Sequence, residues 1–224
     1  YFASQRNKEG WGAMQYPQLL LGMLAIFAYV GVEVGIGSNL GELLKLEEFG
    51  SLQAVEIAPY VSMYWGSLMI GRWAGAVSVF QLSRRNELIA LIAVPFLAYF
   101  IILFANYFAG NEIEHLYYYS VCVVIQVVFS FWSKNKSART MILFSLFGLL
   151  AMIVGLFSSG MLAIYAFLAG GLACSVLWPA IFNIAIMGLG KYTAQGSSFL
   201  IMMILGGGIL PPIQGKLADI IGIH

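Results

Sequence analysis

The sequence carries little charge. Only 9% of its 224 residues are Asp, Glu, Lys or Arg, whereas soluble domains typically carry about 25%. Eleven basic and ten acidic residues leave a net charge of +1, so the chain lacks the basic surface expected of a nucleic-acid-binding protein. Hydrophobic residues make up 61% of the chain. This balance indicates a membrane protein.

Cysteine and histidine are also scarce, with two of each. Cys122 and Cys174 lie inside apolar runs, which argues against a disulfide framework. His115 and His224 lie at the edges of loops and form no HxxxH or HExxH pair. No GxSxG or Walker A sequence occurs. We therefore expect a protein that is not an enzyme and has neither a cofactor nor a metal site.

Long apolar stretches fill most of the chain. A helix needs about 20 apolar residues to cross a hydrocarbon core of ~30 Å. The stretches that reach or approach this length are 18–44, 55–80, 88–109, 115–133, 139–157, 161–189 and 195–215. An open sheet could not satisfy its backbone groups in lipid. The sequence therefore predicts an all-α, polytopic transmembrane helix bundle with seven spans.

Basic residues gather in alternate loops. One side holds eight of the eleven, namely Arg6, Lys8, Arg84, Arg85, Lys134, Lys136, Arg139 and Lys191. The positive-inside rule assigns these loops to the cytoplasm. We therefore expect a chain integral to the plasma membrane, with the N-terminal end of this chain cytoplasmic.

The last apolar stretch is rich in glycine and proline. It contains Gly206, Gly207 and Gly208, followed by Pro211 and Pro212. In water, glycine costs a helix about 1 kcal/mol and interior proline about 3 kcal/mol. Interrupted membrane helices are pointers to binding sites in secondary transporters, but glycines also let two helices pack closely. Both interpretations, a helix break and close packing, remain open.

Three blocks carry a family resemblance. They are WPAIFNIAIMGLGKYTAQGSSFLIMMILGGGILPPIQGKLAD near the end, FAYVGVEVGIGSNLGELL at 27–44 and YWGSLMIGRWAGA at 64–76. Together they resemble sugar permeases of the major facilitator superfamily, in the fucose permease and glucose/galactose transporter family. The resemblance implies proton-coupled uptake of a monosaccharide of the fucose, glucose or galactose class by alternating access. It also implies the bacterial inner membrane, with sugar, proton and the lipid bilayer as partners.

The family has twelve helices in two halves, and this chain is similar to the second half. Residues 1–16 would be a cytoplasmic loop remnant, and residues 17–86 the first two core transmembrane helices. Residues 87–138 would be an inserted transmembrane hairpin on the outside of the bundle, facing lipid. Residues 139–224 would supply three further core transmembrane helices, with the final family helix missing. We thus expect a fragment whose missing N-terminal half carries the main proton-coupling acids.

Glu33 is the most informative single residue. It lies fourteen residues after Leu19, roughly 21 Å along a helix, and ionisable side chains within a membrane usually mark substrate or proton pathways. Tyr29 shares its helix face, and Asn39 continues the polar line outwards. Glu33 is thus a candidate for proton coupling and, with Tyr29 and Asn39, for substrate binding. The alternative is a protonated carboxyl with a purely structural hydrogen bond.

Other candidates lie on later stretches. The resemblance implies a gating contact for Arg72, although its long side chain would also reach the membrane interface by snorkelling. Trp65 and Trp178 are candidates to stack against a sugar ring, and Asn183 and Gln214 to bond its hydroxyls. The alternative for these residues is a structural role, in helix packing, in contact with lipid or at the membrane interface.

A function from another class also fits the composition. The chain would then be a non-transporting membrane sensor or an assembly subunit built on a transporter-like bundle. A passive channel is a third hypothesis, and it predicts sugar flux that ignores a proton gradient.

Overall fold

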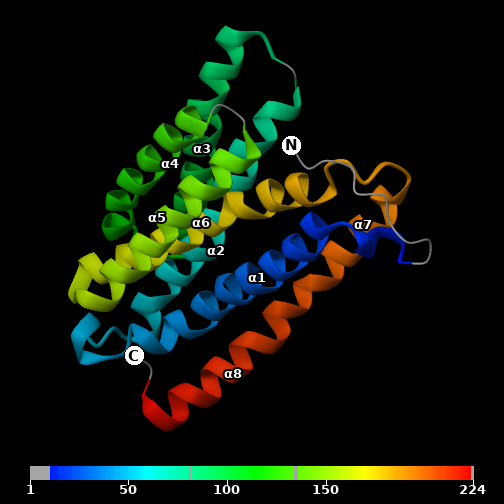
Figure 1. Cartoon of the computed structure of the whole chain (residues 1–224). Coiled ribbons are helices and arrows are strands. Elements are labelled where there is room, and N and C mark those ends of the chain that lie inside the picture. Colours follow the sequence, from blue (N-terminus) through cyan, green and yellow to red (C-terminus); the bar gives the residue numbers. More distant parts are fainter. Residues whose placement is uncertain (1–10, 81, 134–135, 223–224) are drawn as a thin grey trace.

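The computed structural model describes residues 11–80, 82–133 and 136–222. Arg6, Lys8, Lys134 and His224 therefore lie outside the described residues. The described chain forms helices joined by short turns (Figure 1). The long helices are α1 (Pro17–Leu43), α2 (Ala54–Ala76), α3 (Arg84–Phe108), α4 (Ser120–Ser133), α5 (Ser137–Phe157), α6 (Gly160–Ile186), α7 (Thr193–Met202) and α8 (Gly206–Ile221). Short 3₁₀ turns occupy Gly12–Gln15, Glu47–Phe49, Val77–Phe80, Glu114–Tyr119, Gly190–Tyr192 and Met203–Leu205. The all-α prediction is confirmed.

Six segments of the described chain are long and apolar enough to span a membrane. They are Pro17–Leu43, Arg84–Phe108, Glu114–Ser133, Ser137–Phe157, Gly160–Ile186 and Gly190–Ile221. The remaining predicted span, 55–80, forms α2, whose 23 residues are long enough to cross. It is absent from the six because tyrosine, tryptophan, serine and glycine replace aliphatic residues along much of it. The chain is a polytopic helical bundle with six candidate spans.

Helix α6 forms the centre of the bundle. It contacts α1, α2 and α5, and more of it is buried than of any other candidate span. Glycines let its neighbours approach, since a Cβ at Gly171 would lie 2.8 Å from Tyr64 and Ser67 side-chain atoms. A Cβ at Gly170 would lie 2.4 Å from the methyl carbon of Met152 on α5. The apolar composition of α6 therefore reflects burial in protein on several sides.

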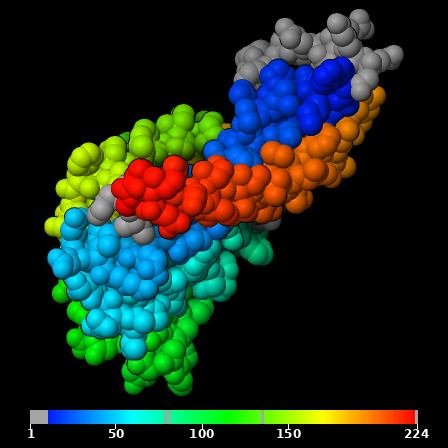
Figure 2. All heavy atoms as spheres, turned by 90° about the horizontal axis from the view of Figure 1, so that it is seen from below, coloured from blue at the N-terminus to red at the C-terminus, as the bar shows by residue number. Residues whose placement is uncertain are grey.

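Helices α1 and α8 pack directly on each other, and in Figure 2 α8 lies along the blue residues of α1. The closest approach is at Gly206, where a Cβ would lie 1.9 Å from the backbone oxygen of Phe27. A Cβ at Gly207 would contact Val30 and Val34, whereas one at Gly208 would meet nothing within 4 Å. Two of the three glycines therefore serve close helix packing.

The last span is interrupted, but upstream of the residues expected to break it. Met203–Leu205 forms a 3₁₀ turn between α7 and α8. Helix α8 then runs from Gly206 to Ile221 through Pro211 and Pro212. Since proline lacks an N–H and its ring clashes with the preceding turn, these prolines remove helix hydrogen bonds without ending the helix. The prolines are thus helical residues in this fold.

The helical hairpin formed by α3 and α4 packs against α2 along one face. Tyr119 is fully buried and donates a hydrogen bond to the backbone oxygen of Leu168 on α6, at 3.3 Å. Asn106 of α3 donates to Ser62 Oγ of α2 at 2.9 Å. The outward face of α3 is apolar and exposed, as at Phe100 and Phe104. The outer face of the hairpin is therefore exposed and its inner face is part of the core, and contact of the outer face with lipid stays a prediction.

Candidate functional site

Glu33 and Arg72 form an ion pair between α1 and α2. Glu33 is 6% exposed, and Arg72 Nη2 donates to its Oε1 at 3.1 Å. The Arg72 side chain is 52% exposed, so its guanidinium borders open space on one side. The second carboxylate oxygen, Glu33 Oε2, is buried and has no hydrogen-bond partner among the described residues. A buried carboxylate oxygen without a protein partner is costly in free energy, so a native protein supplies it with an ordered water, an ion or a functional partner.

Tyr64 of α2 makes a second contact with α1 at the level of the ion pair. Its hydroxyl donates to the backbone oxygen of Glu33 at 2.7 Å, and its side chain is fully buried. The absence of a side chain at Gly37 makes room for this contact, since a Cβ there would lie 2.8 Å from the Tyr64 ring and 2.6 Å from Trp65. Glu33 is therefore held through its own backbone as well as through Arg72.

A cavity of about 340 Å³ opens beside the ion pair. Its lining residues come from α1, α2, α6 and the 3₁₀ turn before α8, and are Tyr29, Val30, Glu33, Arg72, Trp178 and Ile204. The Tyr29 and Trp178 rings lie 6.4 Å apart, and Trp178 stacks on Phe182 at 6.1 Å. The cavity thus combines one carboxylate, one guanidinium and aromatic surface. Such a site accepts hydrogen bonds from hydroxyl groups and covers apolar C–H faces.

Four of the predicted residues thus meet at one cavity. Tyr29, Glu33, Arg72 and Trp178 were singled out on three separate stretches, and the fold brings them together. The guanidinium of Arg72 contacts the Glu33 carboxylate. These roles remain predictions, but the four positions form one physical site.

The remaining candidates lie elsewhere. Asn39 and Gln214 line a separate cavity of about 310 Å³ between α1, α5, α6 and α8. Asn39 donates its amide hydrogen bond to Gly35 of its own helix, at 2.9 Å. Trp65 is 41% exposed and packs edge-on against Tyr64.

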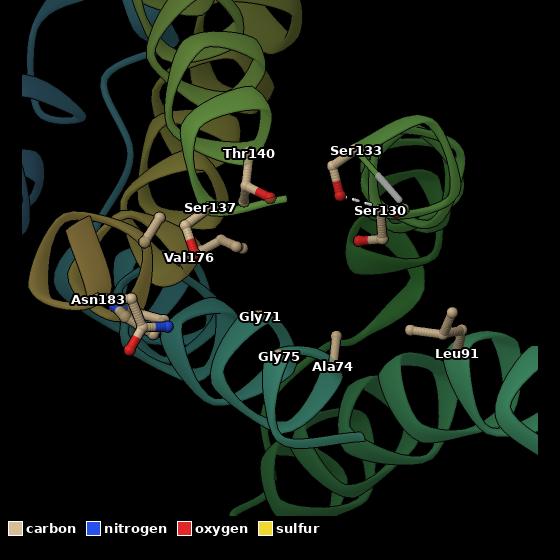
Figure 3. Close-up of a pocket in the computed structure, with 12 residues that line it drawn as sticks. Gly71, Ala74, Gly75, Leu91, Ser130, Ser133, Ser137, Thr140, Val176 and Asn183 are labelled. Atoms are coloured by element: carbon tan, nitrogen blue, oxygen red, sulfur yellow. Dashed lines mark hydrogen bonds between the residues drawn. The ribbon is translucent and has the colours of Figure 1, made fainter. Parts of the chain in front are cut away.

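Asn183 is exposed and lines a third cavity, of about 100 Å³. Figure 3 places it below a gap bordered by Ser130 and Ser133 of α4 and by Ser137 and Thr140 of α5. Nothing in the sequence distinguishes these four hydroxyl groups. Each is unremarkable in its own stretch, and only the packing of α4 against α5 brings them together.

Metal binding finds no support in the arrangement of side chains. Within residues 11–80, 82–133 and 136–222, no three His, Cys, Asp or Glu side chains lie close enough to hold a metal ion. The fold and the site therefore define a polytopic helical membrane protein with an ion pair beside a partly open cavity that has aromatic walls.

Comparison with known proteins identifies the relatives of this bundle. The chain is 31% identical over 218 residues to the glucose/galactose transporter of Brucella abortus biovar 1 (strain 9-941), covering 97% of this chain and 40% of that protein. It is 29% identical over 206 residues to the putative glucose/galactose transporter of Helicobacter pylori (strain ATCC 700392 / 26695), covering 92% of this chain and 37% of that protein. It is 30% identical over 120 residues to the L-fucose-proton symporter of Escherichia coli (strain K12), covering 53% of this chain and 26% of that protein.

The chain is therefore homologous to the glucose/galactose transporters and L-fucose-proton symporters of the major facilitator superfamily, and the resemblance found in the sequence is confirmed. It spans about 40% of the length of the curated glucose/galactose transporters that it matches. These relatives are transporters and not enzymes. No protein-family model and no solved structure matches the chain.

Proposed function

We propose that the chain is part of a secondary active transporter that takes up a monosaccharide together with a proton by alternating access. The observation that carries the proposal is the buried Glu33 carboxylate, whose Oε2 has no partner among the described residues and which lines a cavity with aromatic walls. Homology to proteins named as glucose/galactose transporters and as an L-fucose-proton symporter supports the choice of sugar and proton.

The chemistry of a sugar suits this cavity. A pyranose has hydroxyl groups around its edge and a face of C–H bonds. The Glu33 carboxylate would accept a hydrogen bond from a hydroxyl once its side chain turns toward the cavity, and a charged acceptor makes this bond stronger than a neutral one would. The ring of Trp178, stacked on Phe182, would cover the C–H face.

Proton coupling follows from the ion pair. A proton on Glu33 removes the charge that attracts the Arg72 guanidinium, and so weakens the contact between α1 and α2 at this level. Loss of one partner from an ion pair with a buried member is costly. In this proposal, binding of a proton and of a sugar at Glu33 together determines whether the ion pair between α1 and α2 is kept or broken. Arg72 is then the gating residue.

We further propose the topology of the second half of a major facilitator protein. Residues 17–86 and 139–224 would supply core helices, including α2 as a seventh span, and residues 87–138 an inserted hairpin. Residues 1–16 would belong to a cytoplasmic loop of a bacterial inner-membrane protein, and the N-terminal half would complete the sugar cavity. The positive-inside rule supports this orientation.

The proposal is tested by uptake of labelled sugars into vesicles that contain the full-length protein. Fucose, glucose and galactose are offered separately, with and without an imposed proton gradient. Accumulation of one sugar that requires the gradient supports a proton symporter. Flux that ignores the gradient indicates a passive channel. If none of the three sugars enters, the sugar-transport proposal is wrong and a sensor or assembly subunit becomes the better hypothesis.

A further inference from the structure

One groove on the outer surface of the bundle combines positive charge with apolar walls. It is a cavity of about 310 Å³ between α4 and α5, lined by Trp132, Arg139, Ile142 and Leu143. Trp132 is 65% exposed and Ile142 is 56% exposed. The groove lies apart from the Glu33 cavity, because the two share no lining residue.

The positive charge of Arg139 is not neutralised by an ion pair in the described part of the chain. Arg139 takes part in neither of the ion pairs found among residues 11–80, 82–133 and 136–222. Lys136, exposed, stands at the N-cap position of α5, and the first turn of that helix contains no acidic residue. The N-terminal end of a helix carries a partial positive charge that disfavours cations and attracts anions. Arg139 lines the groove itself, and the exposed Lys136 and the helix end add positive charge at the same end of α5, so this end favours a bound anion.

The rest of the surface favours hydrocarbon. Exposed apolar residues continue from Trp132 along one face of α4, at helical spacing, through Val128, Val124 and Val121. A second exposed apolar face continues from Arg139 along α5, through Ile142, Leu146, Leu149 and Ile153. Both faces end in a residue typical of the membrane–water interface, where tryptophan and arginine concentrate. An occupant of this groove needs an anionic head and a long apolar chain.

We propose that the groove between α4 and α5 binds one anionic phospholipid, with its phosphate at Arg139 and an acyl chain along the apolar faces. Trp132 would border the glycerol region, where its amphipathic ring suits the interface. The lipid would bridge the hairpin of α3 and α4 to the central helices, since α4 and α5 come from either side of the groove.

The test is native mass spectrometry of the full-length protein after removal of copurified lipid. Phosphatidylglycerol and phosphatidylcholine with identical acyl chains are titrated separately. Wild type is expected to bind phosphatidylglycerol more tightly. Arg139→Gln should lose about fivefold of its affinity for phosphatidylglycerol, the effect of one basic side chain near an anionic headgroup. The loss for phosphatidylcholine should be smaller, because its choline cation offsets the charge of the same phosphate.

Arg85→Gln is the matched control. Arg85 is exposed and begins α3, at the same end of the bundle as Arg139, but does not line the groove. This variant should keep the wild-type preference. A second variant, Trp132→Ala, should weaken both lipids alike because it removes apolar contact and no charge.

Several results would overturn the proposal. Equal affinities of Arg139→Gln and wild type for phosphatidylglycerol would remove Arg139 from any lipid site. Tight binding of glycerol phosphate, which has the headgroup chemistry without acyl chains, would indicate a site for a soluble anion. A dimer that forms without lipid and is lost in Arg139→Gln would assign the groove to a protein partner.

Discussion

The contact between α1 and α8 predicts opposite effects for the same substitution at two neighbouring glycines. A Cβ at Gly206 would lie 1.9 Å from the backbone oxygen of Phe27, and an oxygen of the main chain cannot rotate away as a side-chain atom can. Gly206→Ala must therefore push α8 away from α1 by more than 1 Å, roughly the shortfall from an ordinary contact distance of ~3.5 Å. Overpacking of this kind typically lowers the free energy of unfolding by about 1–3 kcal/mol.

Gly208 provides the internal control, because a Cβ there would meet nothing within 4 Å. Alanine at that position gains helix propensity worth up to about 1 kcal/mol and loses no contact. Each variant adds one methyl group to α8, and the two positions are two residues apart. Their difference in stability therefore isolates the approach of α8 to Phe27.

Thermal unfolding in one detergent, followed by tryptophan fluorescence, measures this difference. Gly206→Ala should lower the melting temperature by roughly 2–12 °C, taking 2–4 °C per kcal/mol for a chain of this size. Gly208→Ala should leave it unchanged or raise it. Equal melting temperatures for Gly206→Ala and wild type would show that α8 does not pack on α1 as described.

Three further predictions concern buried polar contacts, each followed by thermal unfolding. Tyr64→Phe should lower the free energy of unfolding by about 1 kcal/mol, because it removes the hydrogen bond to the Glu33 backbone oxygen. Tyr118→Phe, at an exposed ring, should leave that free energy unchanged. Equal effects of the two substitutions would contradict the buried contact. A double-mutant cycle of Glu33→Gln and Arg72→Gln should give a coupling energy of roughly 0.5–3 kcal/mol, and additive effects would mean that the two side chains do not interact. Asn106→Leu should lower the free energy of unfolding by about 1–2 kcal/mol, because it removes the hydrogen bond from Asn106 of α3 to Ser62 of α2. An unchanged melting temperature would contradict the packing of the hairpin on α2.

Much of the bundle could be predicted because a membrane simplifies the physics of the sequence. Apolar runs of sufficient length must be helices in lipid, and each of the predicted stretches is largely helical, although the last is divided between α7 and α8. Burial of Glu33 could also be anticipated, because its distance from the start of the stretch sets its depth.

The partners of these residues could not be predicted from spacing. Arg72 lies 39 residues from Glu33 in sequence, and nothing in its own stretch distinguishes an ion pair from snorkelling. Asn39 appeared to continue the polar line of Glu33, but the fold places it in a second cavity with Gln214.

The prolines and the inserted hairpin show the same limit. Pro211 and Pro212 are strong helix breakers in water, yet α8 continues through them while the interruption falls at Met203–Leu205. Tyr119 lies in the hairpin expected on the outside of the bundle, but it is fully buried and bonds to α6. Tertiary packing decided both cases, and a single stretch of sequence does not contain that information.

The most direct test of the account asks whether Glu33 lies in the transport pathway. Gradient-driven uptake of the accumulated sugar is compared for wild type, Glu33→Gln and Glu47→Gln, where Glu47 is an exposed acid in the turn before α2. The account predicts that Glu33→Gln loses gradient-driven accumulation while Glu47→Gln retains it. Accumulation in Glu33→Gln at the wild-type rate and level, with both variants equally abundant in the membrane, would contradict the proposal and leave the carboxylate a structural role.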